Sequence, residues 1–203
     1  WNQRPREGLW LHWDGNNNSV AERNISAAIG AGATEASLDH GGLERVKDWI
    51  WDFQPPAQFP RDRIDAARAE TGRGVYAAQC GSCHDLGAAQ MGQVVPLAQI
   101  GTDPERLRSF TPELAVNMNT FGTGRPWRFT HFRKTDGYAN MPLDGLWLRA
   151  PYLHNGSVPT LRDLLEPPER RPTVFWRGYT VYDYQHVGFV TTGPEAARFG
   201  CRH

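Results

Sequence analysis

The sequence predicts an all-α protein with long loops, and three observations support this. Ser19 and Glu22 form a capping box at the start of a stretch with helical spacing of apolar residues. Two further stretches, residues 43–53 and 62–79, show the same period. The 203 residues include 21 glycines and 15 prolines, a composition typical of loop-rich proteins. With 39% hydrophobic residues, the chain can form one domain or two small ones.

The first two expected helices make up a helical N-terminal extension. After the capping box, apolar residues share one helical face up to Ile29, and Gly30 ends that helix. The second helix is expected from about Leu43, and Gln-Pro-Pro at 54–56 stops it because proline cannot continue a helix. We therefore expect an extension over residues 1–60, with proline-rich residues 55–60 as its boundary, and a second domain over residues 61–203.

The third helical stretch runs directly into Cys80-Gly81-Ser82-Cys83-His84. This C-x-x-C-H pattern is the attachment site of a c-type haem. Its two thiols reach the two vinyl groups of one porphyrin, and the adjacent imidazole can ligate the iron. A thioredoxin-like pair would follow an apolar strand, and a zinc site would need four ligands, for which the chain has no second C-x-x-C. We therefore predict one covalently bound haem c, held by Cys80, Cys83 and His84.

Short helices and extended loops are expected after this motif. Asp103-Pro104 and Thr111-Pro112 each combine an N-cap with a proline at the first helical position. Thr160 similarly caps residues 161–165. Residues 173–190 are rich in β-branched and aromatic side chains, which predicts a small hairpin or extended loops. We detect no internal repeat in the sequence.

The second axial ligand of the iron would separate an electron carrier from a catalyst. A methionine or histidine closes the iron, whereas a vacant position admits peroxide or oxygen. Met141, followed by Pro142, lies at a separation from the motif that is typical of small c-type cytochromes. It either ligates the iron or packs on the haem edge as a loop residue. Met91 is too close to the motif to reach the opposite face easily, and Met118 is expected in a helix core.

The histidines give fewer candidates. His154 lies in a turn that would bring it near the haem, and the terminal His203 is a further candidate ligand. His12, His131 and His186 stand among aromatic residues and are expected to pack or to lie at the surface. The far-side ligand is therefore Met141, His203 or none.

Arginine and tryptophan side chains surround the Met141 segment. Because haem propionates at a buried edge must be paired, such side chains are suited to bind them, and Arg149 is the candidate that we select. The alternative is an ordinary solvated basic face. The set comprises Arg125, Arg128, Arg133, Arg149, Trp127 and Trp147.

The charge balance and the cysteine motif limit which partners and which cellular compartment we expect. The 22 basic and 22 acidic residues cancel, so nothing suggests a nucleic acid or an acidic membrane surface as partner. No apolar run reaches the length of a membrane span. Because haem is attached to such motifs outside the reducing cytosol, we expect a periplasmic or other extracytoplasmic location.

Cys201 is expected to be an unpaired thiol. The chain opens on Trp1 without a visible signal peptide, and we expect a processed, truncated or excised form.

Residues 145–165, GLWLRAPYLHNGSVPTLRDLL, resemble the C-terminal haem domain of the dihaem cytochrome c peroxidase superfamily. The resemblance is greatest to the branch that includes the rubber oxygenases, and it extends from about residue 62 to residue 197. It implies a cytochrome c-like haem domain, mostly helical and periplasmic, with Cys80 and Cys83 as thioether anchors and His84 as proximal ligand. Pro168 stands near the place where the peroxidases carry a methionine ligand, and the chain has one haem motif where active members have two.

Two functions follow from these observations. The first is a monohaem c-type cytochrome that carries electrons between redox proteins, alone or as a subunit of a larger redox complex. The single haem motif and Met141 favour it. The alternative is a peroxidase- or oxygenase-like haem enzyme, or the truncated half of one, with an open or weakly ligated iron. The superfamily resemblance favours this second function.

Overall fold

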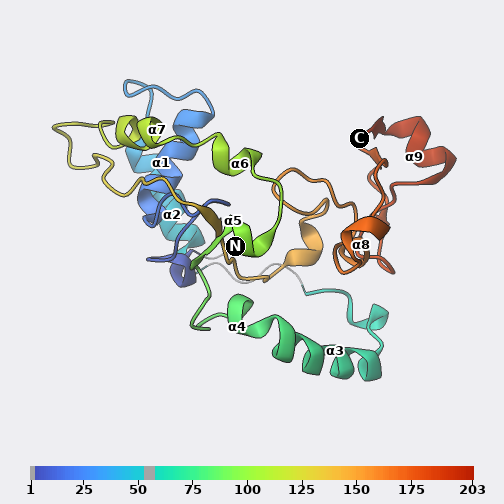
Figure 1. The fold of residues 1–203 in the computed structure, drawn as a ribbon. Coiled ribbons are helices and arrows are strands. Elements are labelled where there is room, and N and C mark those ends of the chain that lie inside the picture. Colours follow the sequence, from blue (N-terminus) through green and yellow to red (C-terminus); the bar gives the residue numbers. More distant parts are fainter. Residues whose placement is uncertain (1–2, 53–57) are drawn as a thin grey trace. The chain divides into compact units, whose positions relative to one another are not determined.

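The computed structural model describes residues 3–52 and 58–203 of the chain (Figure 1). The chain divides into two compact units. Unit 1 contains the described residues of 1–55 and 67–143, and unit 2 contains those of 56–66 and 144–203. This division differs from the predicted domains over 1–60 and 61–203, because the haem motif packs in the same unit as the N-terminal helices. Because compact units need not coincide with sequence domains, the division into domains over 1–60 and 61–203 stays a prediction.

The predicted all-α fold class is wrong. Of the residues that the structure describes, 40% lie in helices and 10% in strands. The described residues contain three two-stranded antiparallel sheets. Strands of two or three residues are too short to show an alternating pattern, so the sequence did not reveal most of them. The pairs are β1 (Val94–Pro96) with β2 (Gly137–Ala139), β3 (Trp176–Arg177) with β6 (Cys201–Arg202), and β4 (Tyr182–Asp183) with β5 (Gly188–Phe189). The last pair confirms the hairpin expected within residues 173–190.

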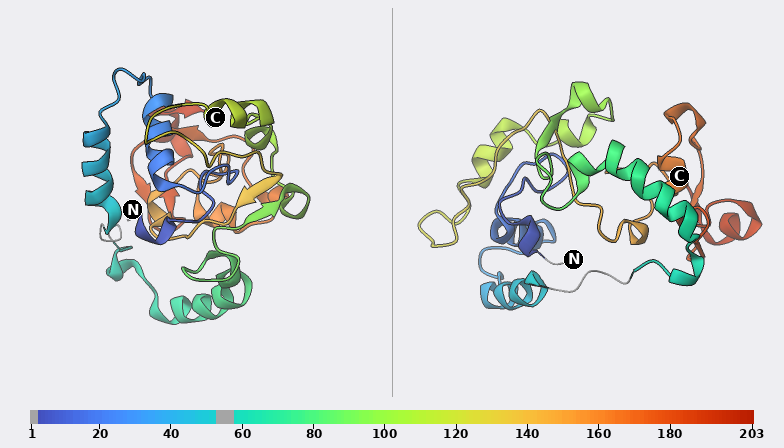
Figure 2. Two further views of the ribbon diagram at one scale, coloured as in Figure 1. Left: turned by 90° about the vertical axis from the view of Figure 1, so that its left-hand side faces the viewer. Right: turned by 90° about the horizontal axis from the view of Figure 1, so that it is seen from below.

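The two N-terminal helices, α1 (Val20–Gly30) and α2 (His40–Trp51), lie side by side in unit 1 (Figures 1 and 2). Half of the predicted capping box is present at α1, where the Ser19 hydroxyl accepts from the Glu22 N–H. The reciprocal bond is absent, because the Ser19 N–H donates to the Asn17 side chain at 2.7 Å and the Glu22 carboxylate accepts from Thr130 and His131. Helix α2 begins earlier than predicted because Asp39 caps it, accepting from the Gly42 N–H at 2.8 Å. The predicted stop at 54–56 lies outside the described residues.

Helix α3 (Ala66–Gln79) is the helix predicted to precede the haem motif, and Cys80 joins it to α4 (Gly81–His84) (Figure 1). Helix α3 begins later than predicted. None of its residues is buried. Its stability therefore depends mainly on its own backbone hydrogen bonds.

The remaining helices are short, as expected for a loop-rich chain. The predicted caps of two of them are confirmed: the Thr111 hydroxyl accepts from the Leu114 N–H at 3.1 Å, and the Thr160 hydroxyl from the Asp163 N–H at 3.1 Å. These helices are η1 (Arg4–Arg6), η2 (Arg61–Arg63), α5 (Leu97–Ile100), α6 (Glu105–Arg108), α7 (Pro112–Met118), η3 (Leu146–Leu148), α8 (Leu161–Leu164), η4 (Pro168–Arg170) and α9 (Gly193–Phe199).

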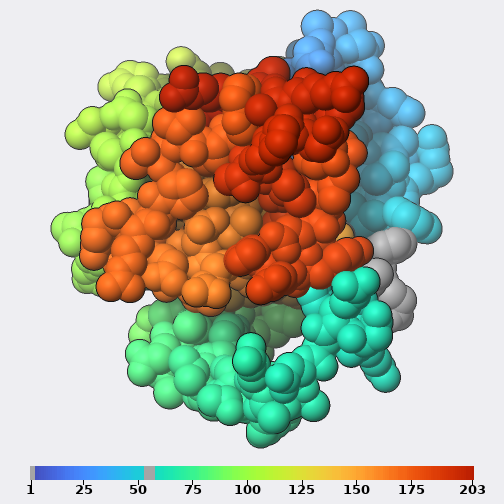
Figure 3. Space-filling view, turned by 90° about the vertical axis from the view of Figure 1, so that its right-hand side faces the viewer, coloured from blue at the N-terminus to red at the C-terminus, as the bar shows by residue number. Residues whose placement is uncertain are grey.

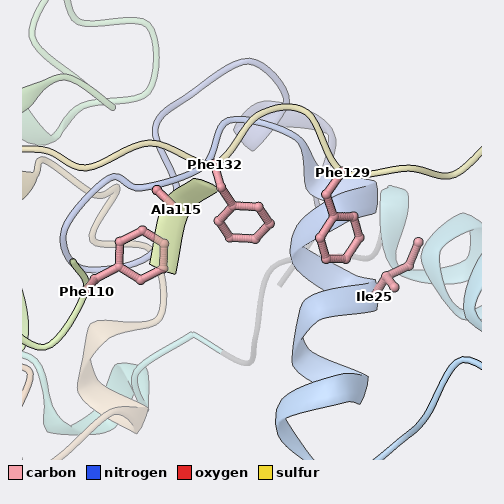
Figure 4. Packing of buried hydrophobic residues seen from close by; sticks show 5 residues of the cluster. All are labelled: Ile25, Phe110, Ala115, Phe129 and Phe132. Carbon is pink, nitrogen blue, oxygen red and sulfur yellow. The ribbon is translucent and has the colours of Figure 1, made fainter. Parts of the chain in front are cut away.

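The core of unit 1 is an aromatic cluster (Figure 4). Phe129 is fully buried, and its ring centroid lies 5.4 Å from that of Phe132. Each such side chain contributes about 2 kcal/mol by leaving water. The cluster joins α1 and α7 to the loop that precedes β2. Its buried members are Ile25, Phe110, Ala115, Phe129 and Phe132, and Met118 packs against them as predicted.

Unit 2 has its own aromatic cluster, centred on Tyr182. The Tyr182 ring lies 5.7 Å from Trp147 and 5.0 Å from Tyr184, in edge-on arrangements that aromatic quadrupoles favour. Its hydroxyl donates to the Trp147 carbonyl, and burial raises the pKa of Tyr182 to about 12. Figure 3 shows the surface of this unit in orange and red.

The same loop–helix element occurs once in each unit, a repeat that the sequence analysis missed. The copies are residues 11–22 in unit 1 and residues 152–163 in unit 2. At the start of the first copy, the Leu11 N–H donates to the Asn17 carbonyl at 2.6 Å. At the start of the second, the Tyr152 N–H donates to the Val158 carbonyl at 2.7 Å. The two copies therefore close the same loop with the same bond.

The remaining backbone features also coincide. The second position is left-handed in both copies, with φ of 63° at His12 and 66° at Leu153. The fifth is a left-handed glycine, Gly15 or Gly156. A hydroxyl residue then caps a helix whose third residue is acidic. Within these twelve positions only the glycine is identical, which explains why the sequence alone did not reveal the repeat.

Candidate haem site

The C-x-x-C-H motif forms one tight turn at the end of α3. The Cys80 N–H donates to the Tyr76 carbonyl at 2.8 Å, which continues the helical bonding of α3. The Cys83 and His84 N–H groups both donate to the Cys80 carbonyl at 3.1 Å. These bonds hold both thiols and the imidazole within a single turn, as attachment to one porphyrin requires.

The chemistry of the donor set fits a covalent haem better than a bare metal ion. Cys80 and Cys83 are unpaired and half-buried, and the Cys83 thiol donates to Gln90 Oε1 at 3.0 Å. Cys201 is also unpaired, as predicted, and exposed. Among the described residues, no three His, Cys, Asp or Glu side chains are grouped so that they could hold a metal ion. The zinc alternative therefore has no ligand set there.

The His84 ring is oriented by a backbone carbonyl that is distant in sequence. His84 Nδ1 lies 2.8 Å from the Met141 carbonyl oxygen. Because a carbonyl can only accept, Nδ1 carries the proton of the neutral ring and Nε2 keeps its lone pair. Nε2 is therefore the nitrogen that can bind iron, and the bond at Nδ1 fixes the tautomer and the ring plane.

Backbone hydrogen bonds hold this carbonyl in place. On the residue before Met141, the Asn140 N–H donates to the Gln93 carbonyl at 2.9 Å, and the Asn140 carbonyl accepts from the Gly92 N–H at 2.7 Å. The Asn140 side chain also donates to the Gln90 carbonyl at 3.0 Å. The segment that follows the haem motif is thus tied to the segment that supports His84.

This hydrogen bond gives Met141 a role other than the predicted one. The contact that the structure shows between Met141 and His84 is made by the main-chain carbonyl of Met141. Ligation of the iron by Met141 stays a prediction. The role that the structure gives to this residue is to orient the imidazole.

Two residues next to the motif were not selected from the sequence. Partial burial, a hydrogen bond with Asp85 and the nearby Cys80 raise the pKa of Tyr76 to about 12, so its hydroxyl stays protonated as a donor. The Asp85 carboxylate also lies against Gly81, where an added Cβ would stand 2.9 Å from Oδ2. Tyr76 and Cys80 are one helical turn apart in the sequence, and this spacing could have suggested that Tyr76 lies beside Cys80.

Arg149 and His154, the predicted haem contacts of the later segment, belong to unit 2. The Arg149 guanidinium donates to the Asp144 carbonyl at 3.3 Å, and His154 is half-buried in the second loop–helix element. His203 also lies in unit 2, where its backbone exchanges hydrogen bonds with Phe175 at 2.8 and 3.2 Å. Their contacts with a haem stay predictions.

His12, His131 and His186 contact other protein groups, as expected of packing or surface residues. His131 lies 2.6 Å from Glu22, and His186 lies 2.6 Å from Asp183. His12 bonds Asn16 at 2.6 Å, and burial lowers the pKa of His12.

Three of the arginines around Met141 have protein partners in unit 1. Arg125 pairs with Glu35 at 3.2 Å, and Arg128 donates to the Asn119 carbonyl at 3.2 Å. The Arg133 guanidinium lies 3.0 Å from the centre of the Trp10 ring, a cation–π contact. These three side chains have structural roles on their own unit.

Residues 137–177 match the family model described as RoxA-like, cytochrome c-like. The match includes Met141, Arg149 and the second loop–helix element. It relates this segment to cytochrome c-like domains and points to haem binding. It does not distinguish between branches of the dihaem peroxidase superfamily.

Two curated proteins of Sinorhizobium fredii (strain NBRC 101917 / NGR234) are similar to the chain. The uncharacterized protein y4iM is 32% identical over 216 residues, which cover 94% of this chain and 48% of that protein. The uncharacterized protein y4iJ is 28% identical over 194 residues, which cover 67% of this chain and 33% of that protein. The chain thus spans about half of the first relative and a third of the second. In the described residues, no helix has the length and apolarity to cross a membrane.

Proposed function

We propose that the chain is part of a periplasmic c-type cytochrome that carries electrons through one haem attached at Cys80 and Cys83. The observation that supports this most is the hydrogen bond from His84 Nδ1 to the Met141 carbonyl at 2.8 Å. It sets Nε2 as the free nitrogen directly beside two unpaired thiols. Neither a structural histidine nor a redox pair of cysteines needs that combination.

Three residues of unit 1 would hold the haem in different ways. Cys80 and Cys83 would form the thioether bonds, and His84 would supply one axial nitrogen. The haem itself supplies reversible one-electron chemistry at its iron. The hydrogen bond from Nδ1 would make His84 a more basic ligand, which would stabilise the oxidised iron and lower the reduction potential.

A periplasmic location is part of the proposal because thioether bonds to haem are formed outside the reducing cytosol. The partners would then be redox proteins that donate and accept electrons. The cancelling charges of the chain give no reason for a nucleic acid as partner.

Intact mass after expression with and without a haem c maturation system tests the attachment. We expect the mass of one haem to be added only with maturation and to persist after denaturation. Replacing Cys80 and Cys83 together by Ser should abolish the added mass. Cys201→Ser is the matched control and should leave it unchanged. A parent chain that lacks covalent haem after maturation would disprove the proposal.

A peroxidase- or oxygenase-like enzyme with an open iron is the second candidate. The observation that favours it is the match of residues 137–177 to the family model described as RoxA-like, cytochrome c-like, within the segment that resembles the rubber oxygenase branch. Carbon monoxide added to the reduced haem protein distinguishes the two candidates. An unchanged low-spin spectrum supports the carrier, and rapid formation of a carbon monoxide complex supports the enzyme.

A further inference from the structure

A cavity of about 190 Å³ lies within unit 2. Its lining is mainly apolar and combines three aromatic side chains with two prolines. Of the described residues that line it, none is acidic and one, Arg177, is basic. The aromatic members are Trp176, Tyr179 and Phe189, and the prolines are Pro151 and Pro159.

The walls of this cavity are held by contacts that do not involve a ligand. Pro151 and Pro159 stand on either side of the bond that closes the second loop–helix element. The Trp176 N–H donates to the Thr191 carbonyl at 3.0 Å. The Tyr179 ring stacks on Phe199 at 5.9 Å with an interplanar angle of 12°. The cavity is therefore preformed, which reduces the ordering cost of binding.

Among the described residues of the lining, Arg177 supplies the one charged side chain, and this side chain is exposed. Among the described residues, no side chain or carbonyl accepts a hydrogen bond from it. It lies beside Gly156, where an added Cβ would stand 3.4 Å from Nη1. A guanidinium binds a carboxylate through two parallel hydrogen bonds, a geometry that a neutral group does not match.

The size of the cavity limits the ligand. An engineered apolar cavity of about 150 Å³ binds benzene, so about 190 Å³ accommodates one ring and a small substituent. We propose that unit 2 binds a compact aromatic monocarboxylate, with the ring among Trp176, Tyr179 and Phe189 and the carboxylate on Arg177. Benzoate is the probe that represents this class.

Calorimetric titration of the full chain with benzoate tests the proposal. Benzyl alcohol keeps the ring without the charge, and acetate keeps the charge without the ring. Each should bind at least about tenfold more weakly than benzoate, because each loses one of the two contacts. Acetate binding as tightly as benzoate, or no benzoate binding at millimolar concentration, would overturn the proposal.

Two variants locate the ligand. Arg177→Met keeps the aliphatic stem and should weaken benzoate binding about tenfold, since one charge-assisted bidentate contact is lost. Arg162→Met is the matched control. Arg162 lies on α8 in a surface pair with Glu166 at 3.5 Å, outside the lining, and its replacement should have no effect. Equal benzoate affinity in the parent chain and the Arg177→Met variant would disprove the role of the guanidinium.

A direct readout comes from the indole N–H signal of Trp176 in NMR spectra, assigned through Trp176→Phe. Benzoate should shift this signal, and a signal that does not move would place the ligand elsewhere.

A haem propionate is a second source of the same carboxylate. Benzoate binding that disappears when the chain carries haem would assign the cavity to the propionate and overturn the proposal of a free ligand.

Discussion

The two loop–helix elements have the same backbone and opposite surroundings. In unit 1, Asp14, Asn16 and Asn17 are at most 1% exposed. The Asp14 carboxylate accepts from Arg106 at 3.1 Å, and the Asn16 carbonyl accepts from the Arg133 N–H at 2.8 Å. The loop of the first copy is thus a buried polar support within its unit.

In unit 2 the corresponding loop is partly exposed. Asn155, which corresponds to Asp14, is exposed, and its side chain accepts only the local Ser157 N–H at 3.1 Å. Pro159, beside the end of this loop, lines the cavity. The comparison shows that one closing bond, one left-handed glycine and one helix cap define the element, and that its side chains can serve either a core or a surface.

Replacing the shared glycine should produce the largest difference in unfolding free energy between the two copies. An alanine at either position costs about 1–2 kcal/mol for the left-handed backbone. At Gly15 the added Cβ would also overlap Val94 Cγ2, so Gly15→Ala should cost about 4 kcal/mol in total. At Gly156 the nearest atom would be Pro151 Cγ at 3.3 Å, so Gly156→Ala should cost about 1.5 kcal/mol.

Urea unfolding followed by circular dichroism measures both costs. Equal losses in the two variants would show that the backbone conformation, and not the packing of the loop, determines the cost.

Removing the acidic residue of the helix cap should have the next largest effect. Glu22 is 6% exposed and accepts from the Thr130 N–H at 2.9 Å and the His131 N–H at 3.1 Å. Glu22→Ala leaves these donors unpaired and should cost about 3 kcal/mol. Asp163, its counterpart, bonds the Thr160 hydroxyl at 2.5 Å near the surface, so Asp163→Ala should cost about 1 kcal/mol.

The same unfolding measurement compares them. Glu22→Gln, which keeps the shape of the side chain, should lose less than Glu22→Ala. A larger loss at Asp163 than at Glu22 would contradict the assignment of the first copy as the buried one.

Acid should weaken the first copy through Glu22. Burial raises the pKa of Glu22, but hydrogen bonds from His131, Thr130 and Asn17 outweigh it and hold the pKa below the ordinary value of 4.5. The stabilisation is therefore fully present above pH 4.5 and is lost as the pH falls through the lowered pKa. Thermal unfolding between pH 6 and pH 3 should show this loss in the parent chain and a flatter profile in Glu22→Gln. Identical profiles would contradict it.

Removing the hydroxyls that cap the two helices should cause the smallest losses of stability, and the losses should be nearly equal in the two copies. Ser19→Ala and Thr160→Ala each remove one hydroxyl that accepts a backbone N–H, at 3.3 and 3.1 Å. Each should cost about 1 kcal/mol. Thermal melts of the two variants that differ by much more than this would indicate that the two elements are not equivalent.

The features predicted correctly from the sequence are the local ones. The hydroxyl caps at Ser19, Thr111 and Thr160 act within one helical turn, so the sequence contains both partners of each bond. The features that were missed join distant segments: Val94 pairs with Ala139 in a short sheet.

Within the candidate site, the same limit applies. Cys80, Cys83 and His84 were predicted to bind haem because of their spacing, and that role stays a prediction. The acceptor at Met141 was not predicted, because a backbone carbonyl is present at every residue and leaves no pattern. Met141 was selected for its sulfur, whereas the structure uses its carbonyl.

The exposure of α3 has a consequence for how the site is assembled. A helix of 14 residues without buried side chains is marginal in water, so its amide hydrogens should exchange with solvent far faster than those of α1. Under the proposed function, the two thiols would stand at the end of a fluctuating segment, within reach of an attachment enzyme. Two thioether bonds would then restrict that fluctuation, so that cofactor loading and local ordering of α3 become one event.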